Sequence, residues 1–253
     1  MAVKLKTPAQ IKTMHEAGRI VAEIHALLRE RVRPGVSTAD LDAFVERELR
    51  KRGATPSFKG YGRPPFPAAI CTAINEQVVH GIPSPRQLLR EGDIIGIDIG
   101  AYYKGFHGDA CVTYPVGKIS PEAERLLRVT EECLWLGIEQ AREGNRIGDI
   151  GHAIQTHAEG EGYGVVRTLV GHGLGHHLHE EPSVSHVGEA GKGPLIRRGM
   201  VFTIEPMINE GTPDWHVLAD GWTVVTDDRK LSAQFEHAVA ITERGTEILT
   251  QLP

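Results

Sequence analysis

The sequence predicts an α+β fold, in which helices cover one face of a mostly antiparallel central sheet. Two observations lead to this prediction. Two helical segments followed by several β-rich segments occur twice along the 253 residues, and short motifs recur in the same order in both halves. Segregated helices and strands within each half are typical of this class. No low-complexity linker divides the chain, so we expect one domain over residues 1–253, with pseudo-twofold halves at roughly 8–117 and 121–245.

Three pairs of motifs carry the internal repeat. In the first pair, a charged turn with glycine leads into an apolar strand that ends in a carboxylate. In the second pair, a short turn lies between two helical segments, and the third pair begins with a histidine. The pairs are LLREGDIIGID (88–98) with LIRRGMVFTIE (195–205), RPGVSTADL (33–41) with REGNRIGDI (142–150), and HGIP (80–83) with HEEP (179–182). We interpret the chain as a duplicated helix–helix–strand unit.

The predicted helices have recognisable starts. A Thr-Pro pair at residues 7–8 is typical of an N-cap and a first-turn proline, and predicts an amphipathic helix through about Arg31. Ser37 caps a second predicted helix that runs to Arg52. The second half repeats this pattern over residues 121–143 and 147–160.

The predicted strands lie between and after the helices. The β-rich segments are 68–80, 93–116, 165–171, 199–209, 222–226 and 235–242. Within the second of these, we expect a hairpin whose turn is centred on Tyr103-Lys104. Such a hairpin would bring Asp98 directly opposite Asp109 on adjacent strands.

Four acidic residues lie in or beside strongly apolar strands. Asp98 is surrounded by isoleucines on both alternating faces, and an unpaired ionised carboxylate there would be very costly. In the repeat, Glu205 takes the place of Asp98 and Glu236 takes that of Asp109. The alternative is a salt bridge to each acid, but these strands contain no nearby basic residue. We therefore expect the four carboxylates to meet at the centre of the sheet and to bind metal.

Charge arithmetic suggests the number of ions. Four carboxylates carry a charge of −4, which two divalent ions balance, with room for a bridging water that ionises near neutral pH. Hard oxygen ligands with some imidazole suit Mn, Fe, Co or Zn.

Among the 13 histidines, three are candidates for the same site. His172 lies between Gly171 and Gly173, which disfavour a helix and allow a strand backbone to approach another segment closely. His80 and His179 are repeat partners that flank the predicted metal site. Either one alone is more commonly structural, but as a pair they are candidates to contact substrate and to move protons.

Composition excludes several other classes of protein. The net charge is −5, so no basic field attracts nucleic acid or an anionic membrane. Three widely spaced cysteines exclude a disulfide scaffold and suit a reducing compartment. The charged N-terminal segment has no signal-peptide pattern, and no apolar run is long enough to span a bilayer. We expect a cytoplasmic protein without membrane or direct nucleic-acid binding.

The sequence resembles the type I methionine aminopeptidases along essentially its whole length. The matching segments are NEQVVHGIP (75–83), GIDIG with FHGDA (96–110), GHGLGHHLHEEP (171–182), FTIEPM (202–207) and DGWTVVTDDRKLSAQFEHAVAIT (220–242). The resemblance implies the pita-bread fold, an α+β domain with internal pseudo-twofold symmetry. It also implies removal of the N-terminal methionine from nascent polypeptides whose second residue is small, by a monomer that contacts the ribosome transiently.

The resemblance further implies roles for individual residues. Two divalent ions per chain (Co, Mn, Fe or Zn) would be held by five side chains, with bridging by two carboxylates, Asp109 and Glu236. Asp98 would complete the ligand set of one ion, and His172 with Glu205 would complete that of the other. Glu205 would also move a proton. His80 and His179 would contact substrate and stabilise the tetrahedral intermediate. The methionine side-chain pocket would be formed by Phe66, Cys71, Leu178 and Trp222, beside Val79 and Gly60.

Two alternative functions share the predicted fold. A proline-directed aminopeptidase or dipeptidase would carry a substantial N-terminal domain, whereas this sequence begins its first predicted helix near residue 8. A non-catalytic pita-bread binding protein would be expected to lose ligands, whereas all five acidic and histidine ligands are present. We therefore expect an active metal-dependent hydrolase.

Overall fold

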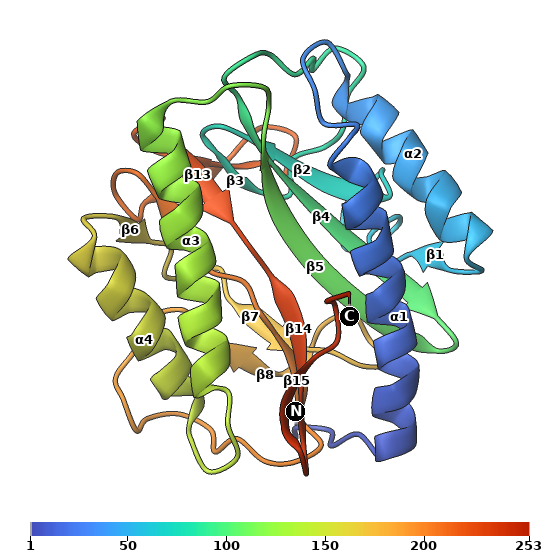
Figure 1. Cartoon of the computed structure of the whole chain (residues 1–253), viewed down its shortest axis with the longest axis vertical. Helices are drawn as coiled ribbons and strands as arrows, with labels where there is room; N and C mark the ends of the chain where they lie inside the picture. Colours follow the sequence, from blue (N-terminus) through green and yellow to red (C-terminus); the bar gives the residue numbers. More distant parts are fainter. Residues whose placement is uncertain (1, 253) are drawn as a thin grey trace.

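In Figure 1, one pair of helices lies to the left of the central strands and the other pair lies to the right. The computed structural model describes residues 2–252, so Met1 and Pro253 of the predicted domain lie outside the described residues. The helices are α1 (Pro8–Leu28), α2 (Thr38–Lys51), α3 (Pro121–Gln140) and α4 (Ile147–Gly160). None of the helices within residues 2–252 is long and apolar enough to cross a membrane.

The helices begin where the sequence predicts, but two of them end early. Thr7 and Ser37 cap α1 and α2 through their side chains, each in a reciprocal capping box. The predictions that α1 runs to Arg31 and α3 to Glu143 are wrong, because the helices end at Leu28 and Gln140. After each helix the chain turns through a glycine with positive φ, Gly35 or Gly144 (86° and 94°), which a continuing helix would not allow.

These two turns show the internal repeat directly. Gly35 donates its N–H to the carbonyl of Leu89, and Gly144 does the same to Ile196. Immediately beyond each turn, an isolated bridge joins Ser37 to Leu88 in the first half and Arg146 to Leu195 in the second. These are equivalent positions in the motif pairs 33–41 with 142–150 and 88–98 with 195–205. The two halves therefore use the same backbone contacts to connect their helices to their strands.

The strands form four hydrogen-bonded sheets, and every strand pair among the described residues is antiparallel. One sheet contains β1 (Thr55–Pro56), β2 (Ile70–Ile74), β4 (Ile94–Tyr103) and β5 (Phe106–Pro115). The five-stranded sheet contains β7 (Gly171–Gly173), β8 (Glu180–Val184), β9 (Val201–Ile204), β14 (His237–Thr242) and β15 (Gly245–Ile248). One smaller sheet contains β3 (Gln77–Val79), β11 (Trp215–Val217) and β12 (Val224–Thr226). The other contains β6 (Gly164–Val165), β10 (Met207–Asn209) and β13 (Ser232–Gln234).

Each helix pair covers the strands of its own half. Ile95, Ile97 and Ile99 of β4 are fully buried and belong to the same apolar cluster as residues of α1 and α2. Phe202 and Ile204 of β9 lie in a second cluster with residues of α3 and α4. Burial of apolar surface at about 25 cal/mol per Å² is the main force that holds the helices on the sheets. Asp98 alternates with the buried isoleucines along β4 and therefore lies on the opposite face of that strand.

The register of the β4–β5 hairpin differs from the prediction. The turn consists of Lys104 and Gly105, both with positive φ, which is the backbone of a two-residue hairpin turn. Asp98 therefore lies opposite Cys111, and Asp109 lies opposite Gly100. The prediction that the two aspartates face each other directly is wrong by this shift. They are diagonal neighbours, and because side-chain direction has a period of two, they remain on the same face.

Candidate metal centre

One cavity of about 310 Å³ brings together the five residues that the sequence predicts as metal ligands. Asp98 comes from β4, Asp109 from β5 and His172 from β7. Glu205 follows β9, and Glu236 precedes β14. Strands from both halves therefore meet at this cavity, which explains why positions so distant in the sequence converge.

The closest group of possible ligand atoms comes from three of these residues. Asp109, His172 and Glu236 each present one ligand atom, and these atoms lie within 4.8 Å of one another. The His172 Nε2 atom is 3.8 Å from Asp109 Oδ2 and 3.7 Å from Glu205 Oε1. The backbone N–H of Glu236 donates to the carbonyl of Cys111, which fixes Glu236 beside the β4–β5 hairpin. This spacing suits direct coordination of a small cation between the side chains.

The electrostatics of the cavity also favour a cation. Burial raises the pKa of Asp98 to about 7 and that of Glu205 to about 8. Burial and the neighbouring carboxylates raise the pKa values of Asp109 and Glu236 well above their usual range. Oδ1 of Asp98 and Oδ1 of Asp109 are buried without a hydrogen-bond partner among the described residues. Orphaned buried carboxylate oxygens are costly, so this donor set fits divalent metal.

The two glycines beside His172 have the role that the sequence predicts. A Cβ atom at Gly171 would lie 2.5 Å from the carbonyl oxygen of Thr203, and one at Gly173 would collide with the carbonyl oxygen of Glu181. Only glycine therefore lets β7 fit between its neighbouring strands. His172 Nδ1 lies 3.1 Å from the carbonyl oxygen of Gly173, so Nδ1 carries the proton and Nε2 is free to accept a cation. Burial lowers the pKa of His172 to about 3, which keeps the ring neutral.

Three residues outside the predicted site hold Glu205 in place. Thr203 donates its hydroxyl to Glu205 Oε1 at 2.7 Å, and Gln234 donates its amide to Oε2 at 3.2 Å. The backbone N–H of Glu205 donates to Nε2 of the fully buried His186 at 3.1 Å. The sequence could have indicated Thr203, because it is a polar residue in the apolar strand VFTI. It could also have indicated Gln234, which lies two residues before Glu236. His186 had no comparable signal, because it lies outside the strands, two residues after the end of β8.

His80 and His179 both line the cavity, as expected of a pair. His80 has a φ of 59°, a left-handed conformation that is unusual for a residue with a side chain and is common at functional sites. Its ring lies edge-on to Trp222, with centroids 6.2 Å apart. The ring of His179 lies 4.1 Å from that of His172. Nδ1 of His179 is 2.6 Å from the hydroxyl of Tyr61, which is another residue outside the predicted site.

The residues predicted for an apolar side-chain pocket occupy one part of the same cavity. They are Phe66, Cys71, Leu178 and Trp222. The rings of Phe66 and Trp222 meet edge to face, with centroids 5.2 Å apart. Burial, and secondarily the nearby carboxylates, raise the pKa of Cys71 well above its usual range, so this thiol is a wall residue and not a nucleophile. Val79 also lines the cavity, whereas Gly60 is not among its lining residues.

We expect metal to stabilise the protein more strongly at pH 8 than at pH 6. In the metal-free protein, Asp98 and Glu205 have pKa values of about 7 and 8, above their unfolded values. Their protonated forms therefore add stability that is fully present below the ordinary carboxyl pKa of about 4 and is lost as the pH rises from there through 7–8. A divalent ion must displace these protons, so it binds more weakly at pH 6. The measurement is the rise in Tm on adding Mn²⁺ to chelator-treated protein at each pH, and an equal rise at both would contradict the expectation.

The sequence and the fold both have close relatives. Residues 12–243 match metallopeptidase family M24. Methionine aminopeptidase 1 of Bacillus subtilis is 52% identical over 98% of each chain, and methionine aminopeptidase of Escherichia coli K12 is 43% identical over 99% of this chain and 94% of that protein. The crystal structure of methionine aminopeptidase from Rickettsia prowazekii superposes with a TM-score of 0.96, at 40% identity over 98% of this chain and all of that one.

A more distant relative shares the fold alone. Prolidase from Pyrococcus furiosus has a TM-score of 0.77 and 24% identity, and only 66% of its chain is covered. The predicted pita-bread fold is therefore confirmed, while the proline-directed alternative receives no specific support. The high sequence identity to methionine aminopeptidases over the full length assigns this hydrolase to a narrower group within the family. The chain belongs to metallopeptidase family M24 and, within it, to the methionine aminopeptidases.

Proposed function

We propose that this protein removes the N-terminal methionine from polypeptides whose second residue is small, by hydrolysis at a site that binds two divalent ions. The observation that carries the proposal is one cavity that holds both the five polar ligands and a separate apolar wall of Phe66, Cys71, Leu178 and Trp222. Its volume of about 310 Å³ is suited to one residue at the end of a chain. The relatives named methionine aminopeptidase support this substrate.

The five ligands divide naturally between two ions. Asp109 and Glu236 would bridge both ions. Asp98 would complete the ligand set of one ion, and His172 with Glu205 would complete that of the other. Four carboxylates balance the charge of two divalent cations, and Co, Mn, Fe or Zn each suit this oxygen-rich set with one imidazole. When bound, the ions supply Lewis acidity for the scissile carbonyl and lower the pKa of the attacking water.

The remaining residues of the cavity act on the substrate itself. The apolar wall accepts the unbranched methionine side chain, which adapts to an irregular pocket. His80 and His179 contact the substrate carbonyl and stabilise the negative charge that develops on its oxygen. Glu205, which Thr203 and Gln234 hold in place, carries a proton towards the leaving amine.

The substrate test uses three tripeptides. We expect release of methionine from Met-Ala-Ser, at least ~10-fold slower cleavage of Met-Lys-Ser and no cleavage of Ala-Ala-Ser, which corresponds to about 1.4 kcal/mol or more of discrimination. A chelator should abolish the reaction, and Mn²⁺ or Co²⁺ should restore it. Equal inactivity of the chelated and metal-loaded protein on all three peptides would overturn the proposed function.

We further propose that the substrates are nascent polypeptides and that the enzyme meets them at the ribosome in the cytoplasm, as a monomer. The three cysteines are free and buried, as expected for a protein in a reducing compartment. Light scattering after gel filtration tests the monomer, and co-sedimentation with translating ribosomes tests the association.

A further inference from the structure

A buried ion pair connects the N-terminal segment to the loop that carries His179. Lys6 Nζ lies 2.7 Å from Glu180 Oε2, and the two side chains are only 4% and 5% exposed. Every other Lys or Arg ion pair recorded within residues 2–252 has at least one side chain that is 23% exposed or more. Because desolvation makes such a pair a weak source of net stability, its position in the fold requires another explanation.

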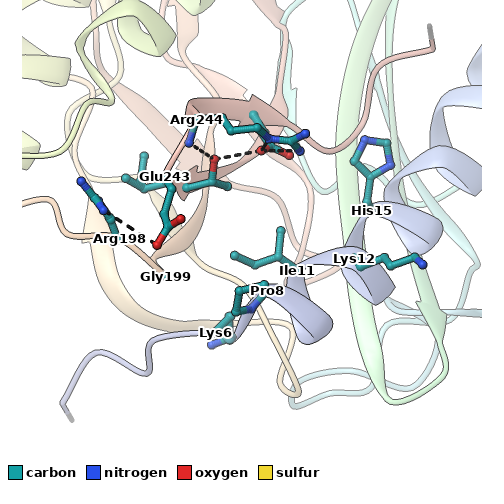
Figure 2. Close-up of a pocket in the computed structure, with 12 residues that line it drawn as sticks. Lys6, Pro8, Ile11, Lys12, His15, Arg198, Gly199, Glu243 and Arg244 are labelled. Carbon is teal, nitrogen blue, oxygen red and sulfur yellow. Dashed lines mark hydrogen bonds and ion pairs between the residues drawn. The ribbon is translucent and has the colours of Figure 1, made fainter.

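Hydrogen bonds to the backbone hold Lys6 in place within the N-terminal segment. Its backbone N–H donates to the carbonyl of Gly199 at 2.6 Å, and its ammonium also donates to the carbonyl of Lys4 at 3.0 Å. Figure 2 shows Lys6 beside Pro8, the first residue of α1. Both residues line a surface cavity of about 620 Å³. The side chain lines this cavity while its ammonium is turned towards Glu180.

Glu180 is the first residue of β8 and the last residue of the segment 174–180, which we call the His179 loop. Its carboxylate connects Lys6 to this loop. Glu180 Oε2 accepts from Lys6, and Oε1 accepts from the backbone N–H of His177 at 3.1 Å. The lysine also packs on the loop backbone, since a Cβ atom at Gly175 would lie 2.5 Å from Lys6 Cε. The loop is therefore held by one carboxylate that contacts both segments, which are 174 residues apart in the sequence.

The same loop carries two residues of the proposed active site. Leu178 lies in the apolar wall, and His179 lines the cavity beside His172. Glu180 follows His179 directly, yet neither Glu180 nor Lys6 lines the catalytic cavity. The loop is therefore the structural connection between the ion pair and the cavity.

We propose that Lys6 is a positioning residue, which anchors the His179 loop through Glu180 so that His179 and Leu178 face the substrate. This inference rests on the proposed aminopeptidase function. It makes the segment before α1 a part of the active-site architecture, although none of its described residues, 2–7, lines the catalytic cavity. Catalytic hydrogen bonds lose efficiency with small displacements, so release of the anchor should lower kcat and raise KM while metal binding persists.

The test compares Lys6→Met with Lys12→Met. Methionine has a similar unbranched shape without the charge, and Lys12 is an exposed residue of α1 on the wall of the same surface cavity. With Met-Ala-Ser, we expect Lys6→Met to lower kcat at least tenfold with unchanged metal content, and Lys12→Met to behave as wild type. Hydrogen–deuterium exchange should increase within residues 174–180 in Lys6→Met only. Unchanged exchange in this loop, or unchanged kcat, would overturn the proposal.

Two further variants separate positioning from folding. Lys6→Met/Glu180→Gln buries no unpaired charge, so its Tm should recover towards that of wild type while kcat stays low; recovery of kcat together with Tm would indicate a structural role only and contradict the proposal. In a His179→Ala background, Lys6→Met should reduce kcat less than twofold further, because its effect passes through His179. A full tenfold additional loss would contradict that route. If wild-type protein cleaves no peptide, the proposed function fails, and loop exchange still tests the anchor.

Discussion

Replacing Glu236 by glutamine is expected to abolish metal binding and to lower kcat/KM for Met-Ala-Ser at least ~10³-fold, about 4 kcal/mol of transition-state stabilisation. Glutamine preserves the shape of the side chain but removes one of the four negative charges that balance the cations. The effect should be large because Glu236 shares the tightest group of ligand atoms, with Asp109 and His172, and is 2% exposed. Mass spectrometry measures the metal content, and peptide kinetics measure kcat/KM.

The same variant has a second expected property that a simple folding defect would not show. In the metal-free protein, burial and Asp109 raise the pKa of Glu236, so ionising this residue opposes folding near pH 8. The metal-free Glu236→Gln protein should therefore unfold at a temperature no lower than metal-free wild type, while added Mn²⁺ no longer raises its Tm. Glu243→Gln, an exposed residue directly after β14, is the matched control and should bind metal normally. Full metal content in Glu236→Gln would remove this residue from the ligand set.

Replacing His179 by alanine should instead separate metal binding from catalysis. We expect kcat to fall about 10²–10³-fold, the usual cost of removing one donor to a developing oxyanion. Metal content should remain that of wild type, because the five proposed ligands are intact. His80→Ala should behave similarly, since both rings line the same cavity and neither belongs to the tightest ligand group.

His177→Ala is the control for this experiment. His177 is exposed and lies two residues before His179 on the same loop, but it does not line the cavity. Its replacement should change kcat less than twofold. A His179→Ala protein that has lost metal would show that this histidine supports the ions, and a protein with unchanged kcat would remove it from the reaction.

Local sequence patterns determined the elements and the candidate residues of this protein. The caps at Thr7 and Ser37 predicted the helix starts, because a cap depends only on residues within one turn. The internal repeat predicted equivalent halves, which the paired bridges at Ser37 and Arg146 show in the structure. Acidic residues beside apolar strands pointed to a shared site, because a buried carboxylate needs a partner wherever it lies.

Tertiary structure alone decided the contacts between distant segments. The turn at Lys104 and Gly105 set the hairpin register, and a change of one residue in a turn moves every opposing pair. The partners of Glu205 and the hydroxyl of Tyr61 beside His179 come from separate loops and strands, which no local period connects. The Lys6–Glu180 pair shows the reason most clearly: each residue is an ordinary surface type in the sequence, and only the packing of the N-terminal segment against the His179 loop buries both charges.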